Sequence, residues 1–496
     1  MKIGLLGFGV VGRGVYDITT NMDNIKVAKV ICLEDISLPD AEVTKDFNSI
    51  LTDSSIDTVV EAMGGLHPAY EFVRAAIEAG KNIVTSNKAL VCTYYDELLP
   101  LAEKMGVQFR CTAAVGGGIG WLSELERSRR IQPLERVGGI MNGTCNYILD
   151  SMTRLGLGYD EALKQAQALG YAEAKPATDV EGIDTWHKVI LSSNIAFGVS
   201  LDTATVPVSG ISKITAEDVS AFTAHGYTCK LISTGKYENG KYSAYVQPTL
   251  VTPGQPEAAV PSNYNLISLV GKYSGRMSFF GQGAGRYPTA YNVVQDCADL
   301  LSGKGFYCNY GPKVAAVNDD LLTFYVRGDI DQWLEDHTAQ RWGNAVITGP
   351  VSVSAMHAWL KEHPGAFIVF DQIKTNEIGS KKSFLLHMQS APEINGNVIT
   401  IGDDSKDILD AVATTATGAT TNVMVATSAG KYKLPLTVCT LAIRTPEEFL
   451  TIPSYYDNAN QKQTGYYVLC NDLDFAGKAL EVAVAPKTFM VYVIKK

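Results

Sequence analysis

The sequence predicts an α/β protein that begins with a doubly wound parallel sheet. Short apolar runs of strand length recur at regular intervals, at residues 2–6, 27–32, 58–61, 82–85 and 107–110. Amphipathic helical patterns lie between these runs, as at 68–79 and 94–104. Strands that alternate with helices at this interval are typical of a parallel sheet covered on both faces.

The composition excludes several classes of protein. Hydrophobic residues make up 46% and charged residues 19% of the 496 residues, as in a folded globular protein. The net charge of −10 argues against nucleic-acid and anionic-membrane partners. No stretch approaches the ~20 apolar residues of a membrane-spanning helix. Nine cysteines without a CxxC pair fit reduced thiols, so we expect a cytoplasmic protein.

A glycine motif, GFGVVG at residues 7–12, directly follows the first strand and opens the first helix. Gly7 would permit a tight turn, Gly9 would let the backbone approach a pyrophosphate, and Gly12 would allow close helix–strand packing. The helix N-terminus would offer N–H groups and a positive dipole end to the phosphates. The motif predicts a Rossmann-type dinucleotide site formed by Gly7, Phe8, Gly9, Val10, Val11 and Gly12. The alternative is a glycine-rich turn without a ligand.

Two acidic residues, Glu34 and Asp35, follow the second strand about 20 residues after the motif. A carboxylate at this place would accept hydrogen bonds from a ribose diol and repel a 2′-phosphate. The sequence therefore favours NAD over NADP as the cofactor. The alternative is that both residues are solvated loop acids.

The length calls for several domains, because single cores rarely grow beyond ~250–300 residues. We expect a dinucleotide-binding domain at 1–130 and an α+β domain at 131–315. A strand pattern followed by a helix pattern indicates a small α/β unit at 316–375. The Thr-, Ala- and Gly-rich composition of 376–496 indicates a separate β-rich module.

Seven segments resemble motifs of the homoserine dehydrogenase family, in the family's order and over about residues 1–310. They are GFGVVG at 7–12, MGG at 63–65, TSNKAL at 85–90, AAVGGGI at 113–119, MNGTCNYIL at 141–149, GYAEAKPATDVEGIDTWHK at 170–188 and GQGAGRYPTA at 281–290. The resemblance implies an NAD(P)-dependent oxidoreductase of threonine and methionine biosynthesis. Its reaction would interconvert L-homoserine and L-aspartate 4-semialdehyde by hydride transfer.

The resemblance also implies a catalytic set of Lys188, Lys88 and Asp184. Lys188 matches the family's proton donor, and a desolvated lysine is a competent acid–base. Asp184 and Lys188 are four residues apart, so they share one face of a helix. On spacing alone, a surface ion pair would be the commoner outcome, and Lys88 alone would be a solvated strand-end lysine. The surrounding motifs favour catalysis.

Further site residues follow from the same resemblance. Glu173 matches the residue that recognises the substrate's amino group, and Asp179 and Thr144 also fall at substrate-binding positions. The additional cofactor-binding positions are Met63, Gly64, Ser86, Lys88, Gly170, Gly283 and Gly285. For the last two glycines, a simple turn between a strand and a helix is the alternative.

The family's monovalent cation, Na⁺ or K⁺, would be held here by Val115, Gly117 and Ile119. Three positions, at residues 112, 120 and 175, depart from the family pattern. Thr112 replaces a glutamate, which weakens the attraction for a cation. Gly120 replaces a proline and loosens the following turn. Lys175 replaces an aspartate two residues from Glu173, so we expect reduced activity or altered cation dependence.

The C-terminal third is harder to assign. Residues 316–375 fit a degenerate version of the family's ACT regulatory unit, but the usual Asp-x-Pro-Gly turn is missing. Feedback inhibition by threonine is therefore a hypothesis. Residues 376–496 resemble nothing in the family, and a fused binding module, a misjoined reading frame and a packing extension stay open. The resemblance implies a homodimer formed through the middle domain.

Two other functions remain open at this point. The chain could be a catalytically weakened dinucleotide- or ligand-sensing protein, or a scaffold, on the same fold; Thr112, Gly120, Lys175 and the unusual tail favour this alternative. It could also be a dehydrogenase for another small amino-acid aldehyde.

Overall fold

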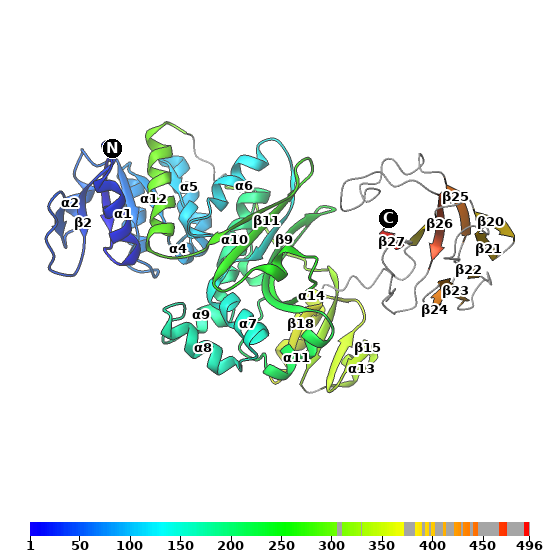
Figure 1. Ribbon diagram of the computed structural model, residues 1–496. Coiled ribbons are helices and arrows are strands. Elements are labelled where there is room, and N and C mark those ends of the chain that lie inside the picture. The colour runs from blue at the N-terminus through cyan, green and yellow to red at the C-terminus, as the bar shows by residue number, and fades with distance from the viewer. Residues whose placement is uncertain are drawn as a thin grey trace. The chain divides into compact units, whose positions relative to one another are not determined.

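The computed structural model describes residues 1–304, 310–328 and 330–371, and beyond them a set of strands between 382 and 495. The chain divides into two compact units, Met1–Ile373 and Lys374–Lys496. Figure 1 shows the chain and labels many of the elements of both units.

The first unit begins with a six-stranded parallel sheet, which confirms the predicted fold class. Its strands are β1 (Lys2–Leu6), β2 (Lys26–Ile31), β3 (Glu42–Thr44), β4 (Thr58–Glu61), β5 (Asn82–Thr85) and β6 (Phe109–Arg110). They lie in the order β3-β2-β1-β4-β5-β6, so the order reverses between β1 and β4. In such sheets, ligands bind beyond the carboxyl ends of the strands at this reversal.

Helices cover both faces of the parallel sheet. They are α1 (Val10–Thr20), α2 (Asn48–Leu51), α3 (Ala69–Glu78), α4 (Lys88–Thr93) and α5 (Tyr95–Met105). A helix from much later in the chain, α12 (Arg286–Leu301), packs against α1, as Figure 1 shows. The helices approach closely, because a Cβ on Gly14 would lie 2.8 Å from the Cβ of Ala290. Residues 286–301 therefore complete the layer that carries the glycine motif.

The next part of the chain forms an antiparallel sheet with helices packed against it. The strands are β7 (Leu134–Ile140), β9 (Thr228–Glu238), β10 (Lys241–Val251), β11 (Tyr264–Gly271) and β12 (Gly275–Gln282), in the order β12-β11-β7-β9-β10. The helices are α6 (Trp121–Arg129), α7 (Gly143–Leu155), α8 (Tyr159–Ala168), α9 (Ala177–Val180), α10 (Ile183–Phe197) and α11 (Ala216–Ala224). Two short strands, β8 (Ser200–Leu201) and β13 (Lys313–Val314), pair with each other. Short 3-10 turns occur at Thr112–Ala114, Thr203–Thr205 and Pro256–Ala259.

Helix α10 is the central element of this layer. It is buried along most of its length and packs against β7, β9, β10, α6 and α4. Its contact with α4 is important for function, because α4 begins at Lys88 at the carboxyl edge of the parallel sheet. The packing of α10 therefore brings the second domain to the edge where a dinucleotide would bind.

The small α/β unit has a βαβββαβ arrangement, with more elements than the strand pattern and helix pattern identified in the sequence. Its elements are β14 (Leu321–Arg327), α13 (Gln332–Asp336), β15 (Thr338–Trp342), β16 (Ala345–Thr348), β17 (Val351–Ser352), α14 (Val353–Glu362) and β18 (Phe367–Asp371). Strand β14 pairs antiparallel with both β16 and β18. Strand β18 also pairs parallel with β10, so the small unit continues the antiparallel sheet.

The second unit is β-rich, as the composition predicts. Its described strands are β19 (Lys382–Met388), β20 (Pro392–Asn395), β21 (Val398–Ile401), β22 (Asp410–Val412), β23 (Thr421–Thr427), β24 (Gly430–Leu436), β25 (Thr440–Arg444), β26 (Tyr466–Leu473) and β27 (Val491–Lys495). They form two sheets with the orders β25-β26-β19-β27 and β20-β21-β22-β23-β24.

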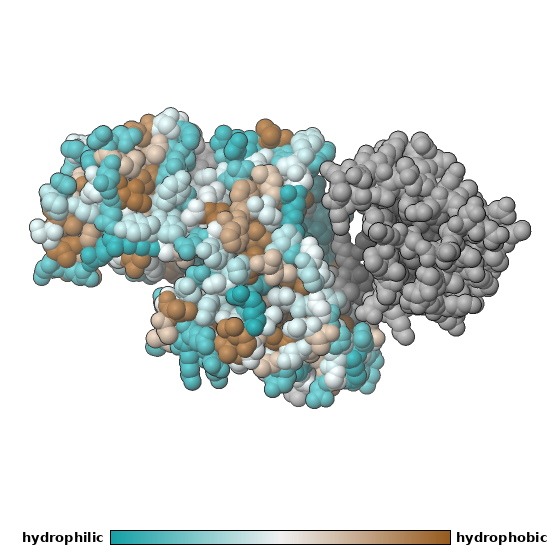
Figure 2. Space-filling view, in the orientation of Figure 1, coloured by the Kyte–Doolittle hydropathy of each residue, from teal (hydrophilic) through white to brown (hydrophobic). Residues whose placement is uncertain are grey.

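The surface of the first unit is mixed in character. Figure 2 shows polar side chains over most of the visible face, with several separate apolar patches. Within the described ranges, no helix combines the length and the apolar character needed to cross a membrane.

Candidate active site

The glycine motif forms the turn between β1 and α1 as predicted. Gly7 has a φ of +93°, and a Cβ there would lie 2.9 Å from the carbonyl oxygen of Ala62. A Cβ on Gly12 would overlap the carbonyl oxygen of Gly7, so this glycine is needed for close helix–strand packing. Gly9, in contrast, faces open space, because a Cβ there would meet no atom within 4 Å. The turn therefore fits the pyrophosphate of a dinucleotide.

The remaining residues of the motif are consistent with this placement. Val10 begins α1 and is 65% exposed, whereas Phe8 is buried beside Tyr16. Arg13, in the first turns of α1, forms an ion pair of 2.8 Å with Glu34 beyond β2. Glu34 therefore contacts the helix that follows the glycine turn, whereas Asp35 forms an ion pair with Lys45.

A buried carboxylate, Glu61, organises the loops that follow β4 and β5. Its Oε1 accepts the N–H groups of Met63 at 2.8 Å and Gly64 at 3.3 Å. Its Oε2 accepts the hydroxyl of Thr85 at 2.5 Å, and the side-chain amide of Asn87 also donates to Oε1 at 3.4 Å. These bonds hold the MGG and TSNK segments together at the carboxyl edge of the sheet. Sequence reasoning missed Glu61 and Asn87.

Two lysines meet one carboxylate at this edge. Lys88 Nζ lies 3.1 Å from Asp184 Oδ1, and Lys188 Nζ lies 2.8 Å from Asp184 Oδ2. Lys188 Nζ also donates to the carbonyl oxygen of Met141 at 2.7 Å. Lys88 begins α4, whereas Asp184 and Lys188 belong to α10, so the two domains supply the cluster jointly.

The electrostatics of the cluster follow from its burial and its opposite charges. Burial alone would raise the pKa of Asp184, but the charges of Lys188 and Lys88 hold it well below its usual range. The charge of Asp184 raises the pKa of Lys88, and burial opposes this effect. Asp184 is therefore ionised, and its negative charge favours the protonated form of Lys88.

Asn142 connects this cluster to the predicted substrate-binding residues. Its side-chain nitrogen donates to Asp179 Oδ1 at 2.7 Å and to Asp184 Oδ2 at 2.8 Å. Thr144 Oγ1 donates to the carbonyl oxygen of Tyr171 at 2.5 Å and lies 3.5 Å from Asp179 Oδ2. Burial, followed by the negative charge of Asp184, raises the pKa of Asp179. Asn142 therefore connects Asp179, and Thr144 beside it, to the lysine cluster. Sequence reasoning did not single out this asparagine.

Glu173 and Lys175 are more exposed than the cluster of two lysines and a carboxylate. Glu173 is exposed, and its negative charge has the smallest of the effects on the pKa of Lys88, after those of Asp184, burial and Asp179. Lys175 is exposed as well. Gly170, with a φ of +76°, provides the turn after α8.

The two C-terminal glycines of the predicted cofactor set lie beside the AAVGGGI segment. A Cβ on Gly117 would lie 2.5 Å from the carbonyl oxygen of Gly283, and Gly118 N–H donates to Gln282 O at 3.1 Å. Gly285, with a φ of +124°, is the residue before α12. The fold thus joins two segments that are far apart in the sequence.

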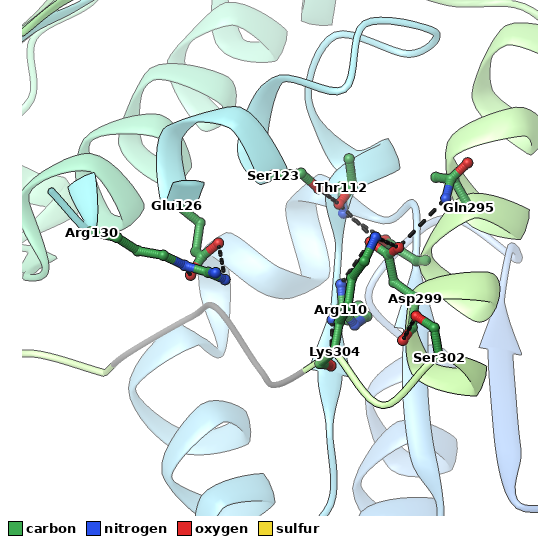
Figure 3. Close-up of polar contacts among 10 residues, drawn as sticks. Arg110, Thr112, Ser123, Glu126, Arg130, Gln295, Asp299, Ser302 and Lys304 are labelled. Atoms are coloured by element: carbon green, nitrogen blue, oxygen red, sulfur yellow. Dashed lines mark hydrogen bonds and ion pairs between the residues drawn. The ribbon is translucent and has the colours of Figure 1, made fainter. Parts of the chain in front are cut away.

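A polar cluster lies behind this segment, and Figure 3 shows part of it. The hydroxyl of Thr112 donates to Asp296 Oδ1 at 2.7 Å, and its N–H donates to Asp296 Oδ2 at 2.9 Å. Thr112 Oγ1 lies 2.8 Å from Ser123 Oγ, and Arg110 Nη1 donates to Asp299 Oδ2 at 3.4 Å (Figure 3). Burial raises the pKa of Asp296 to about 7, against the effects of Thr112 and Arg110.

The fold and the site define a dinucleotide-binding α/β protein with a lysine–carboxylate cluster beside the cofactor loops. Two family models match the chain: homoserine dehydrogenase over residues 121–298, and the homoserine dehydrogenase NAD-binding domain over residues 7–112. The chain is 36% identical to a homoserine dehydrogenase of Bacillus subtilis over 315 residues, which cover 61% of this chain and 73% of that protein. A similar match, 38% over 320 residues covering 61% and 72%, occurs with a homoserine dehydrogenase of Corynebacterium glutamicum.

A solved structure shows the same relationship. A homoserine dehydrogenase from Thiobacillus denitrificans aligns with a TM-score of 0.67 and 28% identity, covering 75% of this chain and 98% of that one. The chain belongs to the homoserine dehydrogenase family, which are NAD(P)-dependent oxidoreductases.

Proposed function

We propose that this protein interconverts L-homoserine and L-aspartate 4-semialdehyde with a nicotinamide dinucleotide, as a step in threonine and methionine biosynthesis. The observation that carries this proposal is the position of Asp184, between Lys88 and Lys188 at the edge where the dinucleotide loops end. The nicotinamide, when bound, supplies or accepts the hydride at the substrate's C4 carbon.

Lys188 is proposed to move the proton. Its ammonium has three hydrogens, and the described contacts, to Asp184 and to Met141 O, use two of them. The third can donate to the carbonyl oxygen of the semialdehyde and stabilise the developing alkoxide. In the reverse direction the neutral amine accepts the hydroxyl proton of homoserine.

The other residues of the cluster are proposed to bind and orient the substrate. Lys88 has one described ion pair, with Asp184, and presents its remaining hydrogens to the same pocket. Glu173 and Asp179 provide carboxylates for the substrate's α-ammonium group. Asn142 fixes Asp179 relative to Asp184, so the substrate's amino group and its reacting carbon would be held at a set separation.

We propose NAD as the preferred cofactor. Glu34 lies beside the glycine turn, because its carboxylate pairs with Arg13, the residue after Gly12. A carboxylate at this place suits a ribose diol and repels a 2′-phosphate. Arg13 offsets part of this repulsion, so NADP would be used less efficiently than NAD but would not be excluded.

The domain roles are part of the same proposal. Residues 131–315 would bind the substrate and form a homodimer, and residues 316–375 would act as a regulatory unit. Strand β12 lies at the edge of its sheet and exposes Phe280, which supports assembly through this domain. Molar mass in solution, measured by light scattering, tests the dimer.

A spectrophotometric assay tests the function. Purified protein, L-homoserine and either NAD or NADP are mixed, and the absorbance of the reduced nicotinamide is followed. We expect turnover, with a higher kcat/KM for NAD. Cofactor binding without turnover would instead support a catalytically weakened sensing protein, and turnover only with another amino-acid alcohol would change the substrate.

A further inference from the structure

Two of the three carbonyl groups expected to hold a monovalent cation, those of Gly117 and Ile119, are already engaged within the protein. The side-chain amide N–H of Asn292, on α12, donates to the carbonyl oxygen of Gly117. The carbonyl oxygen of Ile119 accepts the N–H of Trp121 at 2.6 Å. Asn292 is 2% exposed, so its side chain is held in this place by the surrounding packing.

Direct contact between this amide and Gly117 O disfavours a bound ion there, because it occupies one of the two lone pairs of this oxygen. A bound cation needs several oxygens that converge on one point. For Ca²⁺, the distance from the ion to each oxygen is about 2.3–2.6 Å. The amide hydrogen of Asn292 brings partial positive charge to the lone pair that an ion would use. The opposite orientation of the amide would place two oxygens in contact without a hydrogen, which is unfavourable. The donor orientation is therefore the one that this packing supports.

The charges around residue 112 also argue against a bound cation. At the place of the family's glutamate, Thr112 uses both its N–H and its hydroxyl on Asp296. The nearest carboxylate is thus supplied by α12, and Arg110 Nη1 lies 3.7 Å from it. A guanidinium of the protein itself therefore provides the positive charge beside this carboxylate.

We propose that Asn292, together with the Thr112–Asp296–Arg110 cluster, replaces the monovalent cation of the family, so that this protein needs neither Na⁺ nor K⁺. The amide supplies to Gly117 O the positive end that an ion supplies elsewhere. The claim about catalysis rests on the proposed function, but the claim about binding does not.

The binding claim is tested by thermal unfolding of the full chain. The midpoint is measured in choline, sodium and potassium chloride at equal ionic strength and over a range of concentrations. A bound ion would raise the midpoint saturably, because it stabilises the folded state by mass action. We expect the same midpoint in all three salts. A saturable rise with Na⁺ or K⁺ would overturn the proposal.

A variant shows that the measurement can detect an ion at this place. Asn292→Asp replaces the amide donor by an oxygen, so at a pH where this carboxyl group is ionised two oxygens would face each other and a bound cation could bridge them. We expect its midpoint to be lower in choline and to rise by about 2–4 °C or more with Na⁺ or K⁺. Gln295→Glu, which adds the same charge on the exposed side of α12, should not respond.

If Asn292→Asp does not fold, Asn292→Ala provides the same test, because it frees Gly117 O without adding charge. Failure of the folded variant to respond to either ion would contradict the role given to Asn292. Homoserine oxidation in the same salts separates the two proposals. Equal midpoints without turnover would refute the function alone, whereas turnover that requires K⁺ or Na⁺ would refute the cation inference alone.

Discussion

Lys88 and Asp184 form an ion pair of 3.1 Å between the two domains that together form the candidate active site. Lys88 begins α4 on the dinucleotide-binding side, and Asp184 lies in the first turn of α10 on the substrate side. The pair therefore joins the proposed cofactor-binding and substrate-binding domains through one buried carboxylate, which also pairs with Lys188.

Removal of this carboxylate should damage both stability and activity. Asp184→Asn leaves Lys188 buried without its counter-ion, and loss of one partner from a buried ion pair costs about 3 kcal/mol or more. We expect a comparable fall in the free energy of unfolding, measured by urea titration, and a fall in kcat of at least ~10²-fold. Asp160→Asn, at an exposed position of α8, is the control and should change neither quantity.

The same variant should change the pH dependence. The charge of Asp184 raises the pKa of Lys88, so its removal lets burial dominate and the pKa of Lys88 falls. We expect the alkaline limb of kcat/KM to move to lower pH in Asp184→Asn. An unmoved limb would mean that Lys88 does not act as a charged group in the reaction.

Cofactor preference should depend on Glu34 rather than on Asp35. Glu34→Ala removes the carboxylate beside the glycine turn and releases Arg13 for a 2′-phosphate. We expect the ratio of kcat/KM for NADP to that for NAD to rise by about tenfold, a change of ~1.4 kcal/mol. Asp35→Ala, which frees only Lys45, serves as the matched control. Equal effects of the two substitutions would refute the assignment.

The three glycines of the motif should respond differently to alanine. Gly9 faces open space, so Gly9→Ala should fold normally but bind NAD more weakly, because the methyl group occupies the approach of the pyrophosphate. Gly12→Ala would place a Cβ against Gly7 O and should lower stability by about 1–3 kcal/mol. Thermal unfolding and fluorescence titration with NADH separate the two effects. Loss of stability in Gly9→Ala would contradict this division.

A buried lysine outside the active site should make stability depend on pH. Lys230 is fully buried, donates to Asn146 Oδ1 at 2.9 Å, and burial lowers its pKa to about 8. Between this value and the unfolded value of about 10.4, the unfolded chain binds more protons, so the contribution to stability rises with pH. It is fully present above the unfolded value and is lost as the pH falls through 8.

This prediction is tested with Lys230→Met, which cannot titrate. The difference in unfolding free energy between wild type and variant should grow by up to ~1.4 kcal/mol per pH unit above pH 8. The subtraction removes the contributions of the cysteines and tyrosines that titrate in the same range. Parallel curves from pH 7 to about 10 would show that Lys230 keeps its proton in the folded protein.

Much of the fold was predictable because it depends on local pattern. The alternation of apolar runs and helical patterns predicted the parallel sheet, and the glycine motif placed its first turn. Strand β3 was missed because it has only three residues and no apolar run. Strand β12 was missed because its alternating residues lie at an exposed edge. The parallel pairing of β10 with β18 joins segments that are distant in the sequence, and no local sequence pattern predicts it.

The candidate site was also predictable only in part. Spacing placed Asp184 and Lys188 on one helical face, and motif order indicated Lys88, but neither gives the distance between Lys88 and Asp184. Asn142 carried a signal that was not used, since an asparagine directly before a helix is a common N-cap. Asn292 could not be found from sequence, because a polar residue in an amphipathic helix usually faces solvent, and its partner lies 175 residues away.

The central claim is that Lys188 transfers the proton in a pocket that Asp184 and Lys88 complete. Single-turnover reduction of L-aspartate 4-semialdehyde by pre-bound NADH tests it most directly, with wild type, Lys188→Ala and Lys188→Arg compared. We predict that both variants bind NADH as wild type does and lose hydride transfer by about 10²–10⁴-fold. Hydride transfer at the wild-type rate in Lys188→Ala would contradict the claim.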